Sequence, residues 1–157
     1  MFLLNFSLTG KLSRRALLAA AVPCIVAFGL AKVGTAAESS FRVIVNHDNP
    51  ITSANDQLLT NIFLKRRTDW PDGAAIRPVD LKADSPTRQE FSGTILRRSV
   101  AAVKSYWQQV IFSGRGSPPP ELESDEAVIE YVAGHPGAIG YVSSAASLTQ
   151  VKAITVR

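Results

Sequence analysis

The sequence predicts a single layered α/β lobe with a mostly parallel sheet, formed by residues 38–157. Short β-type runs alternate with segments of helical periodicity, and such alternation requires crossover connections that favour parallel strands. The apolar fraction of 46% and the charged fraction of 19% are typical of a globular domain. About 120 residues are enough to bury a modest core.

The first strand and the first helix are predicted between residues 41 and 64. Phe41–Asn46 is a compact β-type run, and the turn formers at residues 47–50 end it. Thr52 or Ser53 can cap a helix that runs to about Leu64, because apolar residues then recur at helical spacing.

A second strand and a second helix follow a turn at residues 70–73. The strand is expected over residues 75–81, and Pro78 predicts an edge position or an early end. Residues 84–86 read Asp-Ser-Pro, a strong helix start with a capping oxygen and a proline at the first helical position. The helix is expected to reach about Arg97. Its buried side is expected to carry Phe91, Ile95 and Leu96.

Two more helices and two strands complete the lobe. Ser99 is expected to cap a helix that reaches Ile111, and a Gly/Pro loop follows at residues 113–120. Ser124 is expected to cap a fourth helix that Gly134 closes. The final strands are predicted over residues 138–142 and 151–156.

Residues 1–37 are predicted to be a signal peptide, which places the protein in the periplasm. Basic residues precede an apolar run that Pro23 interrupts, and small residues at 34–37 offer a cleavage site. Arg14 and Arg15 are compatible with a twin-arginine signal and equally with an ordinary Sec signal. An uncleaved membrane anchor is the less favoured alternative, since the apolar run is a little short for a bilayer. We expect no membrane span in the mature form, residues 38–157.

The charge distribution argues against nucleic acid as a partner. The sequence holds 17 basic and 13 acidic residues, and four basic but no acidic residues lie within residues 1–37. The remainder therefore has 13 of each kind and is formally neutral. The single cysteine, Cys24, lies in the predicted signal, so no thiol chemistry or cofactor is expected in the mature lobe.

Three segments resemble phosphate-binding proteins of ABC transporters. Residues 59–65 read Leu-Thr-Asn-Ile-Phe-Leu-Lys and Trp70 follows, similar to an IFLGK…W stretch of that family. Residues 84–87 fall where the family has a helix start that grips phosphate. Residues 136–142 match its PGAIGYV segment letter for letter. The resemblance implies one lobe of a type 2 periplasmic binding protein, used in solute uptake.

The predicted ligand is phosphate or another small oxyanion, and two groups of residues are candidates for binding it. At the helix start, backbone N–H groups and the helix dipole favour an anion, and Ser85, Thr87 and Arg88 can contact it. In the loop at residues 113–117, Gly114, Arg115 and Gly116 can form an anion nest. An ordinary N-cap and a flexible connector are the alternatives for these two segments.

No catalytic or metal-binding pattern accompanies these candidates. The sequence lacks a Gly-x-Ser-x-Gly motif, and His47 and His135 have no supporting ligand spacing, so we expect neither an enzyme nor a metal site. Family members clamp the anion between two lobes, so a single lobe is expected to need a protein partner or a second copy to complete the cleft. The alternative is a protein-interaction or regulatory module that kept the lobe and lost ligand binding.

Overall fold

Two buried strands form the centre of the lobe in the computed structural model, which describes residues 40–157. β1 (Phe41–Asn46) and β6 (Ala138–Ser143) run antiparallel with five residue pairs in register. β3 (Arg77–Pro78) pairs with β6 and β7 (Val151–Ala153) pairs with β1, which gives the strand order β3-β6-β1-β7. The predicted signal peptide lies outside the described residues.

Two further strand pairs are short and parallel. β2 (Ser53–Ala54) pairs with β8 (Thr155–Val156), and β4 (Asp80–Leu81) pairs with β5 (Glu121–Leu122). With β3 and β6, three of the five strand pairings within residues 40–157 are parallel, and the predicted α/β class is confirmed. β1 lies between β6 and β7 and is antiparallel to both. The alternation of strands and helices in the sequence does not predict this direction.

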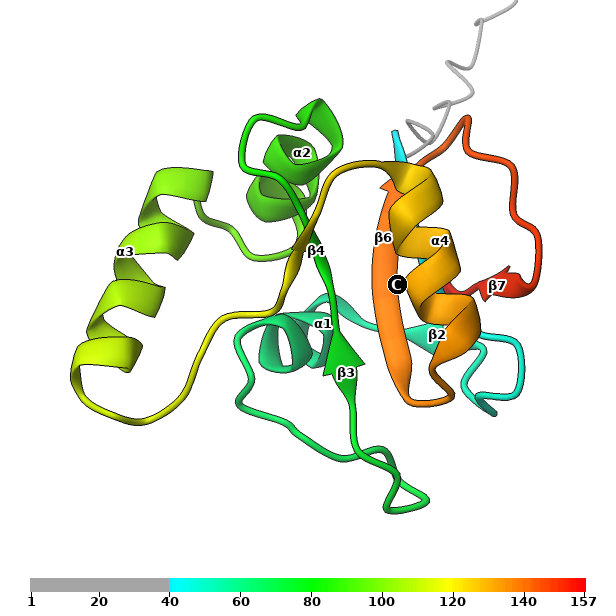
Figure 1. The fold of residues 1–157 in the computed structure, drawn as a ribbon, viewed down its shortest axis with the longest axis horizontal. Coiled ribbons are helices and arrows are strands. Elements are labelled where there is room, and N and C mark those ends of the chain that lie inside the picture. The colour runs from blue at the N-terminus through cyan, green and yellow to red at the C-terminus, as the bar shows by residue number, and fades with distance from the viewer. Residues whose placement is uncertain (1–39) are drawn as a thin grey trace, which may run out of the picture. The chain divides into compact units, whose positions relative to one another are not determined.

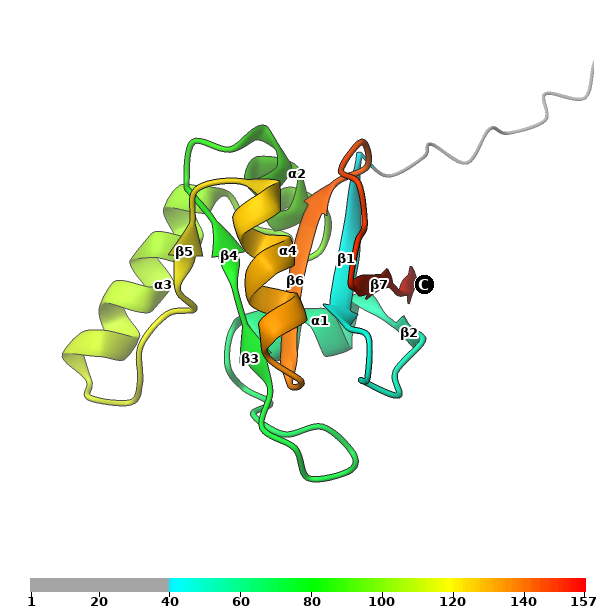
Figure 2. The same cartoon turned by 45° about the vertical axis from the view of Figure 1, so that its right-hand side comes forward.

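Helices cover both faces of the four-stranded sheet (Figures 1 and 2). α4 (Asp125–Gly134) packs on one face, against β6 and β1. α1 (Asp56–Phe63) and α2 (Pro86–Thr94) lie on the other face, where the ring of Tyr141 contacts aromatic rings from both helices. α3 (Val100–Phe112) packs beside α2 and extends away from the sheet (Figure 1).

Serine caps begin three of the four helices within the described range, as predicted. Ser85, Ser99 and Ser124 each accept a hydrogen bond from the backbone N–H three residues further on. The first helix differs from the prediction, since Asn55 caps it and Ser53 lies in β2.

Other element ends also differ from the sequence-based expectation. The strand expected over residues 75–81 consists of β3 and β4, and Pro78 lies at the sheet edge as predicted, because proline cannot donate to a ladder. The strand expected over residues 151–156 is divided into β7 and β8. α2 ends at Thr94 rather than at Arg97, whose φ of 53° is incompatible with a continuing helix.

Two glycines within residues 136–142 permit close packing. A Cβ atom on Gly137 would lie 2.1 Å from the carbonyl oxygen of Ala75. A Cβ atom on Gly140 would lie 2.7 Å from Cγ1 of Val128 in α4 and 3.0 Å from Cγ2 of Val79. The glycines therefore allow α4 and the segment before β3 to approach β6.

We expect Gly140→Ala to destabilise the fold by about 1–3 kcal/mol, because the added methyl group overpacks the contact with α4. Gly93→Ala is the matched control. Gly93 is exposed within α2 with open space around its Cα, so alanine there should stabilise the helix by about 0.5–1 kcal/mol. Urea denaturation measures both changes. An unchanged midpoint for Gly140→Ala would show that α4 does not pack as described.

Candidate functional site

The start of α2 is the helix terminus that the sequence singles out, and it follows the carboxyl end of β4. Ser85 is the N-cap residue, and its Oγ accepts a hydrogen bond from the N–H of Arg88 at 3.4 Å. Pro86 occupies the first helical position. Ser85 and Thr87 are half-buried, so their side chains reach the surface at the positive end of the helix dipole.

Arg88 points into the lobe. Its Nη1 lies 2.9 Å from Oδ1 of Asp80 and 3.3 Å from Oε1 of Glu121, and it also donates to the carbonyl oxygen of Leu81. The side chains of Arg88 and Asp80 are 5% and 7% exposed. The guanidinium therefore pairs with carboxylates, whereas the sequence pattern predicts a charge directed at the anion. The reason is that Arg88 lies on the buried face of α2, together with Phe91.

Asp80 is the centre of this buried cluster. Its Oδ1 accepts hydrogen bonds from the hydroxyl of Tyr141 and from the backbone N–H of Leu81, the latter at 3.1 Å. The ring of Tyr141 stacks on Phe91 with 3.8 Å between the centroids. The cluster thus connects β4, β6 and α2, and it holds the start of α2 in place.

Burial dominates the protonation of this cluster. It raises the pKa of the Asp80 carboxyl to about 6, against the opposing effects of the Arg88 guanidinium and the hydrogen bond from Tyr141. Burial and the neighbouring Asp80 also raise the pKa of the Tyr141 hydroxyl. Sequence reasoning missed Asp80 and Tyr141. An acidic residue between the apolar residues Val79 and Leu81 is the signal that could have identified the first of them.

The second predicted group of residues lies elsewhere. Gly114 and Gly116 adopt positive φ angles of 66° and 152° in the loop that follows α3, and Nε of Arg115 donates to Oγ of Ser113 at 2.8 Å. Figures 1 and 2 show this loop at the opposite end of α3 from α2. The structure therefore does not bring Ser85 and Thr87 together with the loop in one site.

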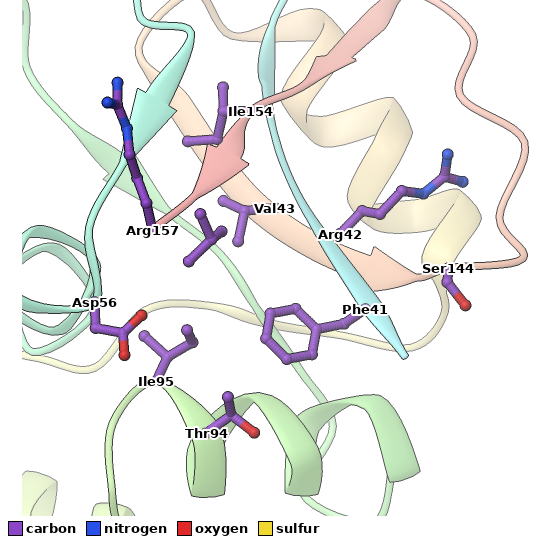
Figure 3. A pocket seen from close by; sticks show the side chains of 10 residues that line it. Phe41, Arg42, Val43, Asp56, Thr94, Ile95, Ser144, Ile154 and Arg157 are labelled. Carbon is purple, nitrogen blue, oxygen red and sulfur yellow. The ribbon is translucent and has the colours of Figure 1, made fainter. Parts of the chain in front are cut away.

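A cavity of about 590 Å³ lies between β1, the end of α2 and the C-terminal strands (Figure 3). It is lined by Phe41, Arg42, Val43, Asp56, Thr94, Ile95, Ser144, Ile154, Val156 and Arg157. Its charged side chains are all held by the protein: Arg42 donates to the carbonyl of Ala146, Arg157 donates to Ser53, and Asp56 pairs with an arginine. None of the predicted site residues lines this cavity.

The chain has the fold of a lobe of a solute-binding protein. It is similar to an ABC-type phosphate transport receptor from Vibrio cholerae, with a TM-score of 0.60 and 22% identity over 74% of this chain and 46% of that chain. A putative phosphate ABC transporter substrate-binding protein from Clostridium perfringens, solved with bound phosphate, is similar with a TM-score of 0.60. Its sequence identity is 19% over 74% of this chain and 44% of that chain. PstS from Borrelia burgdorferi has a TM-score of 0.57 and 14% identity over 75% of this chain and 47% of that chain.

The likeness is one of fold, and it is partial. The chain spans about half the length of these solved proteins. No protein-family model and no curated protein matches the sequence. Among the helices within residues 40–157, none has the length and apolar character needed to cross a membrane.

The raised pKa of Asp80 predicts that stability falls as the pH rises from about 4 to about 6. In this interval the folded protein keeps a proton that the unfolded chain has already released, so a higher pH favours unfolding. A pKa difference of about two units changes the free energy of unfolding by at most about 3 kcal/mol across this interval. Urea denaturation across this range should show a smaller decline in Asp80→Asn, which cannot titrate at this position. Identical pH profiles for both proteins would contradict the assignment.

Proposed function

We propose that residues 38–157 are a non-catalytic, exported module that binds phosphate or a similar small oxyanion at the start of α2. The observation that carries the proposal is the position of this helix start, after the carboxyl end of β4 in a lobe with the fold of phosphate-binding proteins. Helix N-termini at this edge of an α/β sheet are suited to anions. Ser85 and Thr87 supply the side-chain donors.

Arg88 acts in this proposal as a positioning residue. Its charge is neutralised by Asp80 and Glu121, and its contacts fix the first turn of α2. The anion then meets the backbone N–H of Thr87 and the two hydroxyls, without a nearby free guanidinium. Pro86 has no N–H, and the N–H of Arg88 already donates to Oγ of Ser85. A single lobe also leaves one side of the anion in water, so we expect weak affinity unless a second copy or a protein partner closes over it.

Export is part of the same proposal. Residues 1–37 act as the signal peptide, by the Sec or the twin-arginine route, and release the lobe into the periplasm. Two features support this location. The sequence of the segment has the basic, apolar and small-residue regions of a signal, and the proteins of similar fold include phosphate transport receptors.

Isothermal titration of the purified protein with phosphate and sulfate tests the proposal. We expect binding in the millimolar range or tighter, and Thr87→Val should weaken it roughly tenfold, since one hydrogen bond to a charged ligand is lost. Thr94→Val is the matched control, because it removes a hydroxyl from the other end of the same helix. Absence of heat for both anions, or equal effects of the two variants, would contradict the proposal.

A specific observation also favours the alternative, a protein-interaction module. A shallow cavity of about 480 Å³ includes Ala83, two residues before Ser85, in its wall. Its concave surface is lined mostly by apolar side chains and the stems of polar ones. The other residues that line it are Arg88, Val100, Ala101, Lys104, Trp107, Gln108, Ile111, Pro118 and Glu121. Ile111 is 51% exposed and the neighbouring Phe112 is 90% exposed, which is unusual for large apolar side chains.

Sedimentation of the purified protein tests whether a second copy covers this surface. If a second copy covers this surface and the adjoining Phe112, wild type should dimerise with rising concentration, and Phe112→Ser should remain monomeric without a loss of stability. Gln109→Ser, an exposed position on the same helix, should dimerise as wild type does. A monomer at every concentration would exclude a second copy as the partner of this surface.

A further inference from the structure

A basic cavity of about 410 Å³ lies between the end of α1, α3 and the loop that follows α3. It is lined by Leu64, Lys65, Arg66, Thr68, Tyr106, Trp107, Val110, Arg115, Gly116 and Ser117. Three cationic side chains and no carboxylate are present in this lining. The fold therefore places Lys65 and Arg66 around the same cavity as Arg115, which is distant from them in the sequence.

Lys65 occupies a backbone position that favours glycine. The amide of Lys65 donates to the carbonyl of Ile62 at 2.9 Å, and that of Arg66 donates to Asn61 at 2.7 Å, which together form a Schellman motif at the end of α1. The φ angle of Lys65 is 50°, in the left-handed region that costs a side-chain-bearing residue energy. Glycine at this position would remove that cost, so the backbone effect and the charge of Lys65 can be tested separately. Its Nζ reaches the carbonyl of Pro118 at 3.3 Å.

The other two cations are also positioned by contacts that leave their charge unneutralised. The guanidinium of Arg66 lies 5.9 Å from the centroid of the Tyr106 ring, and the Tyr106 hydroxyl donates to the carbonyl of Leu64 at 3.2 Å. Arg115 donates to Ser113. Within residues 40–157, none of Lys65, Arg66 and Arg115 forms an ion pair.

The nearest acidic residue in the sequence is Asp69, next to the cavity wall. Its carboxylate accepts a hydrogen bond from the hydroxyl of Thr68 at 2.7 Å, and its carbonyl accepts one from Nε of Arg67 at 3.0 Å. These contacts hold Asp69 on the strand-like segment that pairs with Ala75. Asp69 forms no ion pair with any of the three lining cations.

We propose that this cavity binds a polyanion with two or more linked phosphate groups. One small oxyanion occupies little more than a few water volumes of about 30 Å³ each, and it would leave most of a cavity of this size to water. A chain of phosphate groups can contact all three, and it can use the backbone N–H of Gly116 and the hydroxyl of Ser117 as further donors. This site is separate from the start of α2.

Isothermal titration of the purified protein with inorganic tripolyphosphate, together with thermal melting, tests this inference. Lys65→Gly is the decisive variant, since the two readouts should move in opposite directions. Glycine relieves the left-handed conformation and should raise the Tm, whereas the loss of the ammonium should weaken tripolyphosphate binding at least tenfold. A residue with only a structural role would not produce this combination.

Further variants keep the test decisive. Arg115→Gln should also weaken tripolyphosphate binding several-fold, while Lys104→Gln, which removes one charge from α3 outside this cavity, should leave the affinity unchanged. Equal weakening by Lys104→Gln would show diffuse attraction and overturn the inference, as would unchanged binding in Lys65→Gly. Thr87→Val should not affect tripolyphosphate, and Lys65→Gly should not affect phosphate, so failure at one site is distinguishable from failure at the other.

Discussion

The buried pair of Asp80 and Arg88 is the interaction on which the position of the candidate site depends. Asp80 lies in β4 and Arg88 in the first turn of α2, and Tyr141 of β6 donates to the same carboxylate. Removing both charges from water is costly, and the surrounding hydrogen bonds offset only part of that cost. A shift of α2 would leave a buried charge without its partner, so the pair fixes the helix relative to the sheet.

This use of Arg88 determines the chemistry that remains at the start of α2. With the guanidinium neutralised inside the lobe, the proposed anion would meet the helix dipole, the backbone N–H of Thr87 and the hydroxyls of Ser85 and Thr87. Each of these is a partial charge, and the open face of a single lobe keeps water close to them. Such a site discriminates by geometry more than by net charge, and it gains most from a partner that excludes water.

The sequence predicts the elements of this lobe better than their arrangement. Local chemistry defines helix starts, so Ser85, Ser99 and Ser124 are correctly identified as caps. The antiparallel placement of β1 depends on contacts between distant segments, which alternation of elements does not encode. The inward direction of Arg88 could have been predicted from the sequence, because Arg88 and Phe91 are three residues apart and share the buried face of the helix.

Formal neutrality is a poor guide to what a small lobe can bind. The described lobe is close to balanced in charge, yet folding directs Arg88 to carboxylates in the interior and gathers Lys65, Arg66 and Arg115 around one cavity. At physiological ionic strength the screening length is about 8 Å, so an anion responds to the charges beside it and hardly to the total. An overall charge that argues against nucleic acid as a partner therefore leaves room for a compact polyanion, provided that the fold concentrates its cations. Lys65 joins this cluster from a left-handed backbone position, with a φ of 50°, that a glycine would occupy at lower cost.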